Sequence, residues 1–233
     1  KPINYGADIV IHSTTKYITG NGTSIGGIII DAGNFDWSSG LFDEFTTPSA
    51  GYHGLVYHEA LGPAAFIAKA RIEGLRDLGS APSPFNCFQT IQGLETLSVR
   101  IKKHSENALK VAKWLENQDK VAWVNYPGLK SSKYNNLSKK YLKNGQSGIV
   151  TFGLKGGFDS AKKLTDSTKI FSLLANFGDS KSLIIHPSST THQQLNEEQQ
   201  KSTGVTADLV RLSIGLEDPV DLINDLKDAL SSI

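Results

Sequence analysis

Short apolar runs alternate with longer amphipathic stretches along the chain, an order typical of an α/β protein. Two runs rich in β-branched residues, at positions 8–12 and 27–31, predict buried strands near the start. Similar runs predict four more strands, at positions 122–126, 147–154, 182–186 and 209–214.

Apolar residues at helical spacing predict helices over positions 59–78, 86–118 and 158–174. We expect Pro82 and Pro84 to end the first of these helices. The last helix has the clearest start, because Asp218 is a good N-cap and Pro219 suits the first helical position.

The helix over 86–118 is long enough to connect two domains, and we place a boundary inside it near His104. Residues 1–103 would then form part of a larger α/β domain. Residues 104–233 would form a smaller α/β domain.

Composition and net charge indicate which kind of binding partner to expect. The 233 residues are 39% hydrophobic and 20% charged, and their 24 basic and 23 acidic side chains give a net charge of +1. No global field therefore favours nucleic acid or an anionic membrane, and no apolar run approaches the roughly 20 residues that cross a bilayer. We expect small-molecule partners rather than nucleic acid or membrane.

The cysteine and methionine content indicates where the protein is located and whether the chain is part of a longer polypeptide. Cys87 is the single cysteine, so it forms no internal disulfide and builds no zinc site by itself, and a cytoplasmic protein is expected. The chain has no methionine and opens at Lys1 almost directly on a strand-like run. We expect it to be the downstream part of a longer polypeptide.

The first candidate chemistry lies where the strand over 8–12 ends. Ser13, Thr15 and Lys16 follow it and enter a glycine-rich loop, at the strand end where α/β sheets favour ligands. Hydroxyls can bind a phosphate, and a lysine shielded from water can attack an aldehyde, which together suggest pyridoxal phosphate. Alternatively, the hydroxyls cap a turn and Lys16 is a solvated surface lysine.

The segment HSTTKY at residues 12–17, with the glycines that follow it, closely resembles the cofactor-lysine segment of a known family. The family is the Cys/Met-metabolism pyridoxal phosphate (PLP)-dependent enzymes, which contain cystathionine synthases and lyases and O-acetylhomoserine sulfhydrylase. The resemblance covers essentially the whole chain and continues, in the family's order, through PSPF (82–85), GLETLSVR (93–100), YPGL (126–129), SLIIHP (182–187) and VRLSIGLED (210–218).

The resemblance implies the aspartate aminotransferase-like α/β architecture, called fold type I, with part of the large PLP domain followed by the small C-terminal domain. Lys16 matches the lysine that attaches the cofactor and later moves protons between substrate carbons. Ser13 and Thr15 match the hydroxyl ligands of the cofactor phosphate.

Two further residues match the substrate-binding positions of the family. Arg211 corresponds to the arginine that grips the substrate α-carboxylate, whereas taken alone it could be a structural ion-pair partner. Asn176 occupies the loop that also approaches the carboxylate, where several relatives carry Ser, and its alternative role is simple turn formation.

Within the family, two segments favour the sulfhydrylase. Residues 34–78 resemble the longer insert of sulfhydrylases, and residues 175–192 resemble the sulfhydrylase version of that loop. The expected reaction is a γ-replacement in which O-acetylhomoserine and a sulfide donor give homocysteine and acetate. A cystathionine γ-synthase or γ-lyase activity is the alternative. Asn21, where many relatives have His, puts any role of that imidazole in doubt.

The resemblance also implies groups that lie outside this sequence. In the family an aspartate upstream of the lysine pairs with the cofactor ring, and active sites lie between paired subunits of a homotetramer. A second alternative is therefore a non-catalytic piece that binds cofactor poorly without its upstream half.

Other patterns lead to weaker hypotheses. Residues 22–26 match the G-x-S-x-G pattern of serine hydrolases, but they lead into a strand rather than into a helix. The pairs His53 with His58 and His186 with His192 lack the helical spacing of zinc ligands, so we expect no metal and read them as structural or substrate-channel residues.

Overall fold

A computed structural model describes all 233 residues. The chain forms two compact units. The first unit comprises residues Lys1–Thr14 and Ile25–Gln89, and the second comprises Thr15–Ser24 and Thr90–Ile233. The predicted boundary between residues 103 and 104 separates the large and small domains of the family. The two compact units do not test this boundary, so it stays a prediction.

The first unit is built around an antiparallel ribbon of two strands, β1 (Ile9–Ser13) and β2 (Gly27–Asp31). Both strands were predicted, but their predicted burial is wrong, since Ile28, Ile29 and Ile30 are 39% to 46% exposed. A two-stranded ribbon gives each side chain few neighbours. The β-branched residues therefore predicted the strand correctly but not whether other elements cover it.

Short helices complete the first unit: α1 (Asp43–Thr46), α2 (Tyr57–Leu61), α3 (Ala65–Lys69) and a π-helical segment, Ala70–Asp77. The helix predicted over 59–78 is therefore present but interrupted, because Gly62 adopts a φ of +51° and Pro63 follows it in a 3-10 turn. Trp37, Phe45, Tyr57 and Ala65 form the unit's small core.

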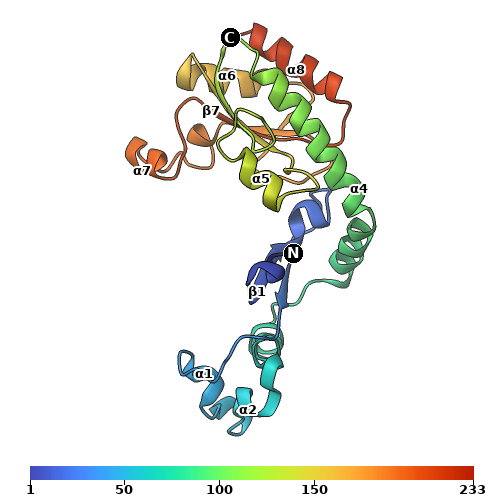
Figure 1. Cartoon of the computed structure of the whole chain (residues 1–233), viewed down its shortest axis with the longest axis vertical. Coiled ribbons are helices and arrows are strands. Elements are labelled where there is room, and N and C mark those ends of the chain that lie inside the picture. Colours follow the sequence, from blue (N-terminus) through green and yellow to red (C-terminus); the bar gives the residue numbers. More distant parts are fainter. The chain divides into compact units, whose positions relative to one another are not determined.

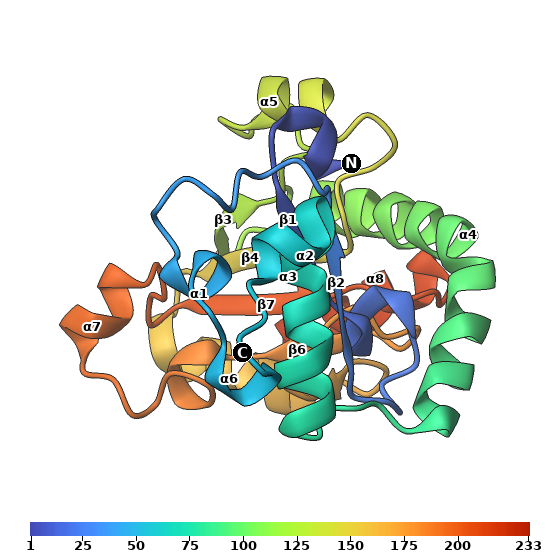
Figure 2. The ribbon, with the colours of Figure 1, turned by 90° about the horizontal axis from the view of Figure 1, so that it is seen from below.

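The second unit contains a five-stranded mixed sheet in the order β3 (Val121–Asn125), β4 (Ile149–Leu154), β7 (Leu209–Ser213), β6 (Leu183–Ile185) and β5 (Ser172–Leu173). All neighbouring strands are antiparallel except β5 and β6. Figure 2 shows β7 as a long arrow through the middle of this sheet. The four strands predicted in this region are confirmed to within two residues.

Helices from distant parts of the sequence share one core with the sheet: α4 (Pro84–Leu115), α6 (Gly157–Ser167) and α8 (Pro219–Ser231). Figure 1 shows these helices around β7, with α5 (Asn135–Tyr141) and α7 (Glu197–Ser202) as shorter additions. The Asp218 carboxylate accepts the Val220 N–H at 2.8 Å, so the predicted N-cap of α8 is confirmed. No helix combines the length and apolar content needed to cross a membrane.

The helix predicted over 158–174 is wrong in its second part, because α6 ends at Ser167 and β5 follows. Asp225 of α8 supplies the reason. Its carboxylate accepts the backbone N–H groups of residues 169, 170 and 171 at 2.8, 2.8 and 3.2 Å. Those N–H groups would bond within a continuing helix, and a buried carboxylate far along the chain takes them instead.

Candidate active site

Lys16 lies in a π-helical turn, Thr14–Ile18, that directly follows β1 in the chain. Its backbone departs from helical geometry, with φ −88° and ψ −132°. The side chain is half-buried, and its Nζ donates a hydrogen bond to Asn176 Oδ1 at 2.6 Å. The same Nζ lies 5.0 Å from the centre of the Phe177 ring. Lys16 is therefore not the solvated surface lysine of the alternative hypothesis.

The loop that carries Asn176 is tied to the end of β7. The Gly178 N–H donates to the Ser213 hydroxyl at 3.1 Å. Gly178 has a φ of +76°, and a Cβ at this position would lie only 2.6 Å from the Tyr17 nitrogen. A glycine is required here because only glycine permits both this conformation and this approach to the Lys16 segment.

Asn176 takes part in a turn and also contacts Lys16, whereas its role beside the substrate carboxylate stays a prediction. Its N–H donates to the Leu174 carbonyl at 3.0 Å, which is a turn interaction, while its side chain accepts from Lys16. Its own carbonyl accepts a hydrogen bond from Arg211 Nη2 at 3.3 Å. One residue thus joins the amine and the guanidinium.

Arg211 sits in β7 between two fully buried neighbours, Val210 and Leu212. The ion pairs of the structure, Lys69 with Glu73 and Lys201 with Glu197, lie elsewhere, so Arg211 is not a structural ion-pair partner. Burial lowers the pKa of Arg211 below its usual value, although a guanidinium stays charged at neutral pH. A partly desolvated cation of this kind favours a carboxylate ligand.

The predicted phosphate ligands fall on both sides of the unit boundary. Ser13 is the exposed last residue of β1 in the first unit, and Thr15 is half-buried in the second. Their role stays a prediction. The donor set fits pyridoxal phosphate chemically, since hydroxyls suit a phosphate, a primary amine suits an aldehyde carbon, and the Lys16 amine is held by a neutral acceptor rather than by a carboxylate.

A profile of the family described as Cys/Met metabolism PLP-dependent enzymes matches residues 1–231. The chain belongs to this family. The predicted family and the predicted fold class are thereby confirmed, and a PLP-dependent chemistry is confirmed for the family as a whole.

The chain is 54% identical to an O-acetyl-L-homoserine sulfhydrylase of Leptospira meyeri, over 100% of this chain and 54% of that protein. It is 50% identical to a homocysteine synthase of Schizosaccharomyces pombe, over 99% of this chain and 54% of that protein. The chain thus spans about half the length of the curated relatives it matches. That this half is the downstream one stays a prediction.

A solved structure from Campylobacter jejuni, described provisionally as an O-acetylhomoserine (thiol)-lyase, matches with a TM-score of 0.92 and 46% identity. The match covers 99% of this chain and 55% of that protein, which carries a pyridoxyl-lysine monophosphate. At this identity and similarity, the two share their fold over the matched region.

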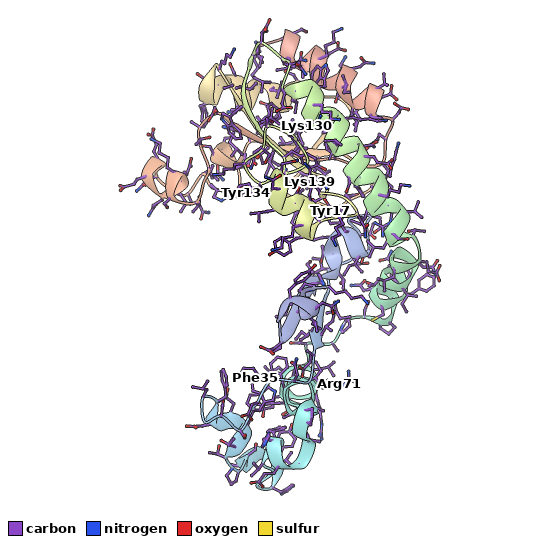
Figure 3. All side chains as sticks on the ribbon, viewed as in Figure 1. Tyr17, Phe35, Arg71, Lys130, Tyr134 and Lys139 are labelled. Atoms are coloured by element: carbon purple, nitrogen blue, oxygen red, sulfur yellow. The ribbon has the colours of Figure 1, made fainter.

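Sequence reasoning missed the aromatic support of the Lys16 segment. The Tyr17 ring packs edge to face on His104 of α4, with centroids 5.2 Å apart, and its hydroxyl accepts the Gly148 N–H at 3.1 Å. Figure 3 shows Tyr17 beside α4. His104 Nδ1 lies 2.6 Å from the Ile214 carbonyl, and burial lowers the pKa of His104, which favours the neutral ring.

Arg100 was also missed as a site residue, although it ends the motif GLETLSVR. Within this motif Gly93, Thr96 and Arg100 are spaced by three and then four residues, which places them on one face of a helix. This spacing could have predicted that the three residues contact the same segment of the chain. Arg100 donates to the Tyr17 and Ile18 carbonyls at 2.8 and 3.1 Å, immediately after Lys16.

The competing patterns remain without support as sites. Ser24 of the G-x-S-x-G pattern is buried, and the pattern leads into β2 rather than into a helix. His186 uses both ring nitrogens, with Nδ1 2.8 Å from Ser189 Oγ and Nε2 2.9 Å from the Ala207 carbonyl. These contacts agree with a structural role for His186.

Proposed function

We propose that this chain carries the cofactor lysine and the carboxylate-binding arginine of an O-acetylhomoserine sulfhydrylase. The reaction replaces the acetate of O-acetylhomoserine by sulfide and gives homocysteine. The observation that carries the proposal is the double contact of Asn176, whose Oδ1 accepts from Lys16 and whose carbonyl accepts from Arg211. An amino-acid substrate needs both of these groups at one place, one for its amine chemistry and one for its carboxylate.

Lys16 would hold the cofactor covalently, and Ser13 and Thr15 would bind its phosphate. When bound, pyridoxal phosphate supplies a conjugated ring that withdraws electrons from the substrate carbons. The chain supplies position. Lys16 Nζ would also serve as the base that takes and returns protons at the substrate carbons.

Asn176 orients that base, because its Oδ1 takes one N–H of the lysine and so directs the rest of the ammonium or amine group. Arg211 would bind the substrate carboxylate through its planar fork, which fits two carboxylate oxygens better than a lysine does. Holding the carboxylate fixes the carbon chain of the substrate relative to Lys16. Holding reacting groups in place in this way is a large part of the rate enhancement by enzymes.

The replacement balances without a redox partner. The bond between Cγ and the ester oxygen breaks, a bond between Cγ and sulfur forms, and hydrogen sulfide supplies the proton that leaves with acetate. Two relatives named as a sulfhydrylase and a homocysteine synthase, at 54% and 50% identity, support this substrate pair. The proposal includes a cytoplasmic homotetramer with shared active sites, and a gel-filtration mass of a monomer for the full-length protein would contradict that part.

The test uses the full-length protein that contains this chain. With O-acetylhomoserine and sulfide we expect homocysteine, and we expect Lys16→Ala to abolish it. Borohydride should fix the cofactor to the peptide that contains Lys16, as read by mass spectrometry. A label on another lysine would overturn the proposed site. Preferential release of an α-keto acid and cysteine from cystathionine would replace the sulfhydrylase by a lyase.

A further inference from the structure

Arg100 is a buried arginine whose hydrogen-bond partners are all neutral. Its residue is 9% exposed. Nη1 donates to the Tyr17 carbonyl at 2.8 Å, and Nη2 donates to the carbonyls of Ile18 at 3.1 Å and Gly93 at 2.7 Å. Nε donates to Thr96 Oγ1 at 3.0 Å. Four of the five N–H groups of the guanidinium are therefore used, three of them by backbone carbonyls.

Burying a cation without a carboxylate is costly unless dipoles replace the lost water. Carbonyls at the end of a helical turn carry partial negative charge, and the Tyr17 and Ile18 carbonyls end the turn that contains Lys16. Burial lowers the pKa of Arg100, yet the guanidinium remains charged. The cation is therefore stable in this place only while those carbonyls converge on it.

Two glycines make this approach sterically feasible. A Cβ at Gly93 of α4 would overlap the Ile18 carbonyl oxygen and lie 2.6 Å from the Thr19 oxygen. Gly20 has a φ of +79°, and a Cβ there would overlap the guanidinium of Arg100. We call Gly20, Gly93 and Arg100 the Arg100 clasp.

The Arg100 clasp acts directly on the backbone of the lysine. The Gly20 N–H donates to the Lys16 carbonyl at 2.9 Å. Consecutive carbonyls of Lys16, Tyr17 and Ile18 thus each have a fixed partner, one from Gly20 and two from Arg100. The direction in which the Lys16 side chain leaves the backbone depends on this fixed turn.

We propose that Arg100 is a positioning residue. It holds the backbone next to Lys16 by binding the Tyr17 and Ile18 carbonyls, and it touches neither cofactor nor substrate. The inference rests on the proposed function for the role of Lys16. It goes further by assigning a function to the arginine of the GLETLSVR motif and to Gly20 and Gly93, which permit its approach. A lysine could not replace this arginine, because one ammonium cannot span the same four acceptors with planar geometry.

The test compares Arg100→Lys and Arg100→Gln with the matched control Arg71→Lys, which changes an exposed arginine of the first unit. In the full-length enzyme with cofactor we expect kcat to fall by about 10- to 100-fold for Arg100→Gln, the range that misplacement of a reacting group produces. The fall should be smaller for Arg100→Lys, and KM should change less than kcat. Arg71→Lys should leave both unchanged.

A second readout needs no cofactor. Amide hydrogen exchange at Gly20 reports the bond to the Lys16 carbonyl, and in cofactor-free protein we expect it to accelerate at least tenfold in both Arg100 variants. If either protein fails to fold, Thr96→Val removes the Nε bond together with the long 3.4 Å bond of Thr96 Oγ1 to the Gly93 carbonyl. It leaves the three bonds from the guanidinium to carbonyls, so it should give the same changes at smaller size. Unchanged exchange at Gly20 together with kcat within twofold of wild type would overturn the inference.

The two proposals fail in different ways. If Lys16→Ala retains activity and cofactor attachment, the proposed function fails, whatever happens at Arg100. If Lys16→Ala is inactive while Arg100→Gln behaves as wild type in rate and exchange, only the positioning role fails.

Discussion

Lys16 and Asn176 lie 160 positions apart in the sequence, yet the lysine Nζ donates to the asparagine Oδ1 at 2.6 Å. Asn176 also accepts from Arg211 through its backbone carbonyl, at 3.3 Å. The two contacts use different atoms of one residue. A side-chain substitution at position 176 therefore separates the lysine contact from the arginine contact.

On the proposed function, Asn176→Ala in the full-length protein should weaken turnover more than substrate binding. It removes the acceptor of Lys16 and leaves the carbonyl that Arg211 uses. A hydrogen bond to a charged group contributes about 1.5 to 3 kcal/mol, so we expect kcat to fall by roughly tenfold to a hundredfold. The measurement is steady-state kinetics with O-acetylhomoserine. The control, Asn117→Ala, removes an exposed asparagine that bonds only its own helix end, and its kcat should stay at the wild-type value.

On the proposed function, Arg211→Lys in the full-length protein should act mainly on substrate binding. The lysine keeps the charge but loses the fork that matches two carboxylate oxygens, and it is too short to reproduce the bond to Asn176. We expect KM for the amino-acid ester to rise by about tenfold or more, because charge-assisted bidentate pairs are roughly twice as strong as neutral hydrogen bonds. Inhibition by amino-acid analogues with and without a carboxylate provides the check. Equal loss of affinity for both kinds of analogue would contradict the assignment.

Local sequence patterns predicted a helix or strand well where a few residues with a strong conformational preference mark it. Asp218 and Pro219 mark the start of α8, and the β-branched run at Gly27–Asp31 became β2 with the same ends. Burial was less predictable, because it depends on how many elements cover a strand, and β2 has one partner strand.

The candidate site shows the same division between local and distant information. Resemblance marked Lys16, Asn176 and Arg211, and the structure brings these three together. Periodicity could not show that Asp225 ends a helix by accepting N–H groups 54 to 56 positions away. Nor could it show that Arg100 reaches carbonyls 82 and 83 positions upstream, because pairings at such separations follow from the assembled fold.

Asp225→Asn should destabilise the second unit without changing its charge pattern elsewhere. Asp225 Oδ2 accepts the N–H groups of Ile170 and Phe171, and Oδ1 accepts that of Lys169. An amide has only one acceptor oxygen, so its NH₂ would face at least one N–H donor, and we expect a loss of about 3 kcal/mol in the free energy of unfolding. Denaturant unfolding measures this. Asp228→Asn, an exposed change on the same helix, should stay within about 0.5 kcal/mol of wild type.

His104 should make the protein sensitive to mild acid. The ring is fully buried, its Nε2 has no hydrogen-bond partner, and burial lowers the pKa of His104 below its ordinary value of 6.5. The nearby Arg100 charge lowers this pKa further, while the Ile214 carbonyl, Glu217 and Asp179 oppose the shift without cancelling it. Below pH 6.5 the unfolded chain therefore takes up a proton that the folded chain resists, so the free energy of unfolding falls as the pH falls.

The measurement is the midpoint of denaturant unfolding between pH 8 and pH 5. His104→Gln should be less stable at pH 8, because it loses the bond to Ile214, but its midpoint should fall less steeply towards pH 5. Burial also lowers the pKa of His186, so some slope should remain in the single variant and decrease further in His104→Gln with His186→Gln. His12→Gln, an exposed change, should keep the wild-type slope. A wild-type slope in His104→Gln would mean that the buried ring takes up its proton as readily in the folded chain as in the unfolded one.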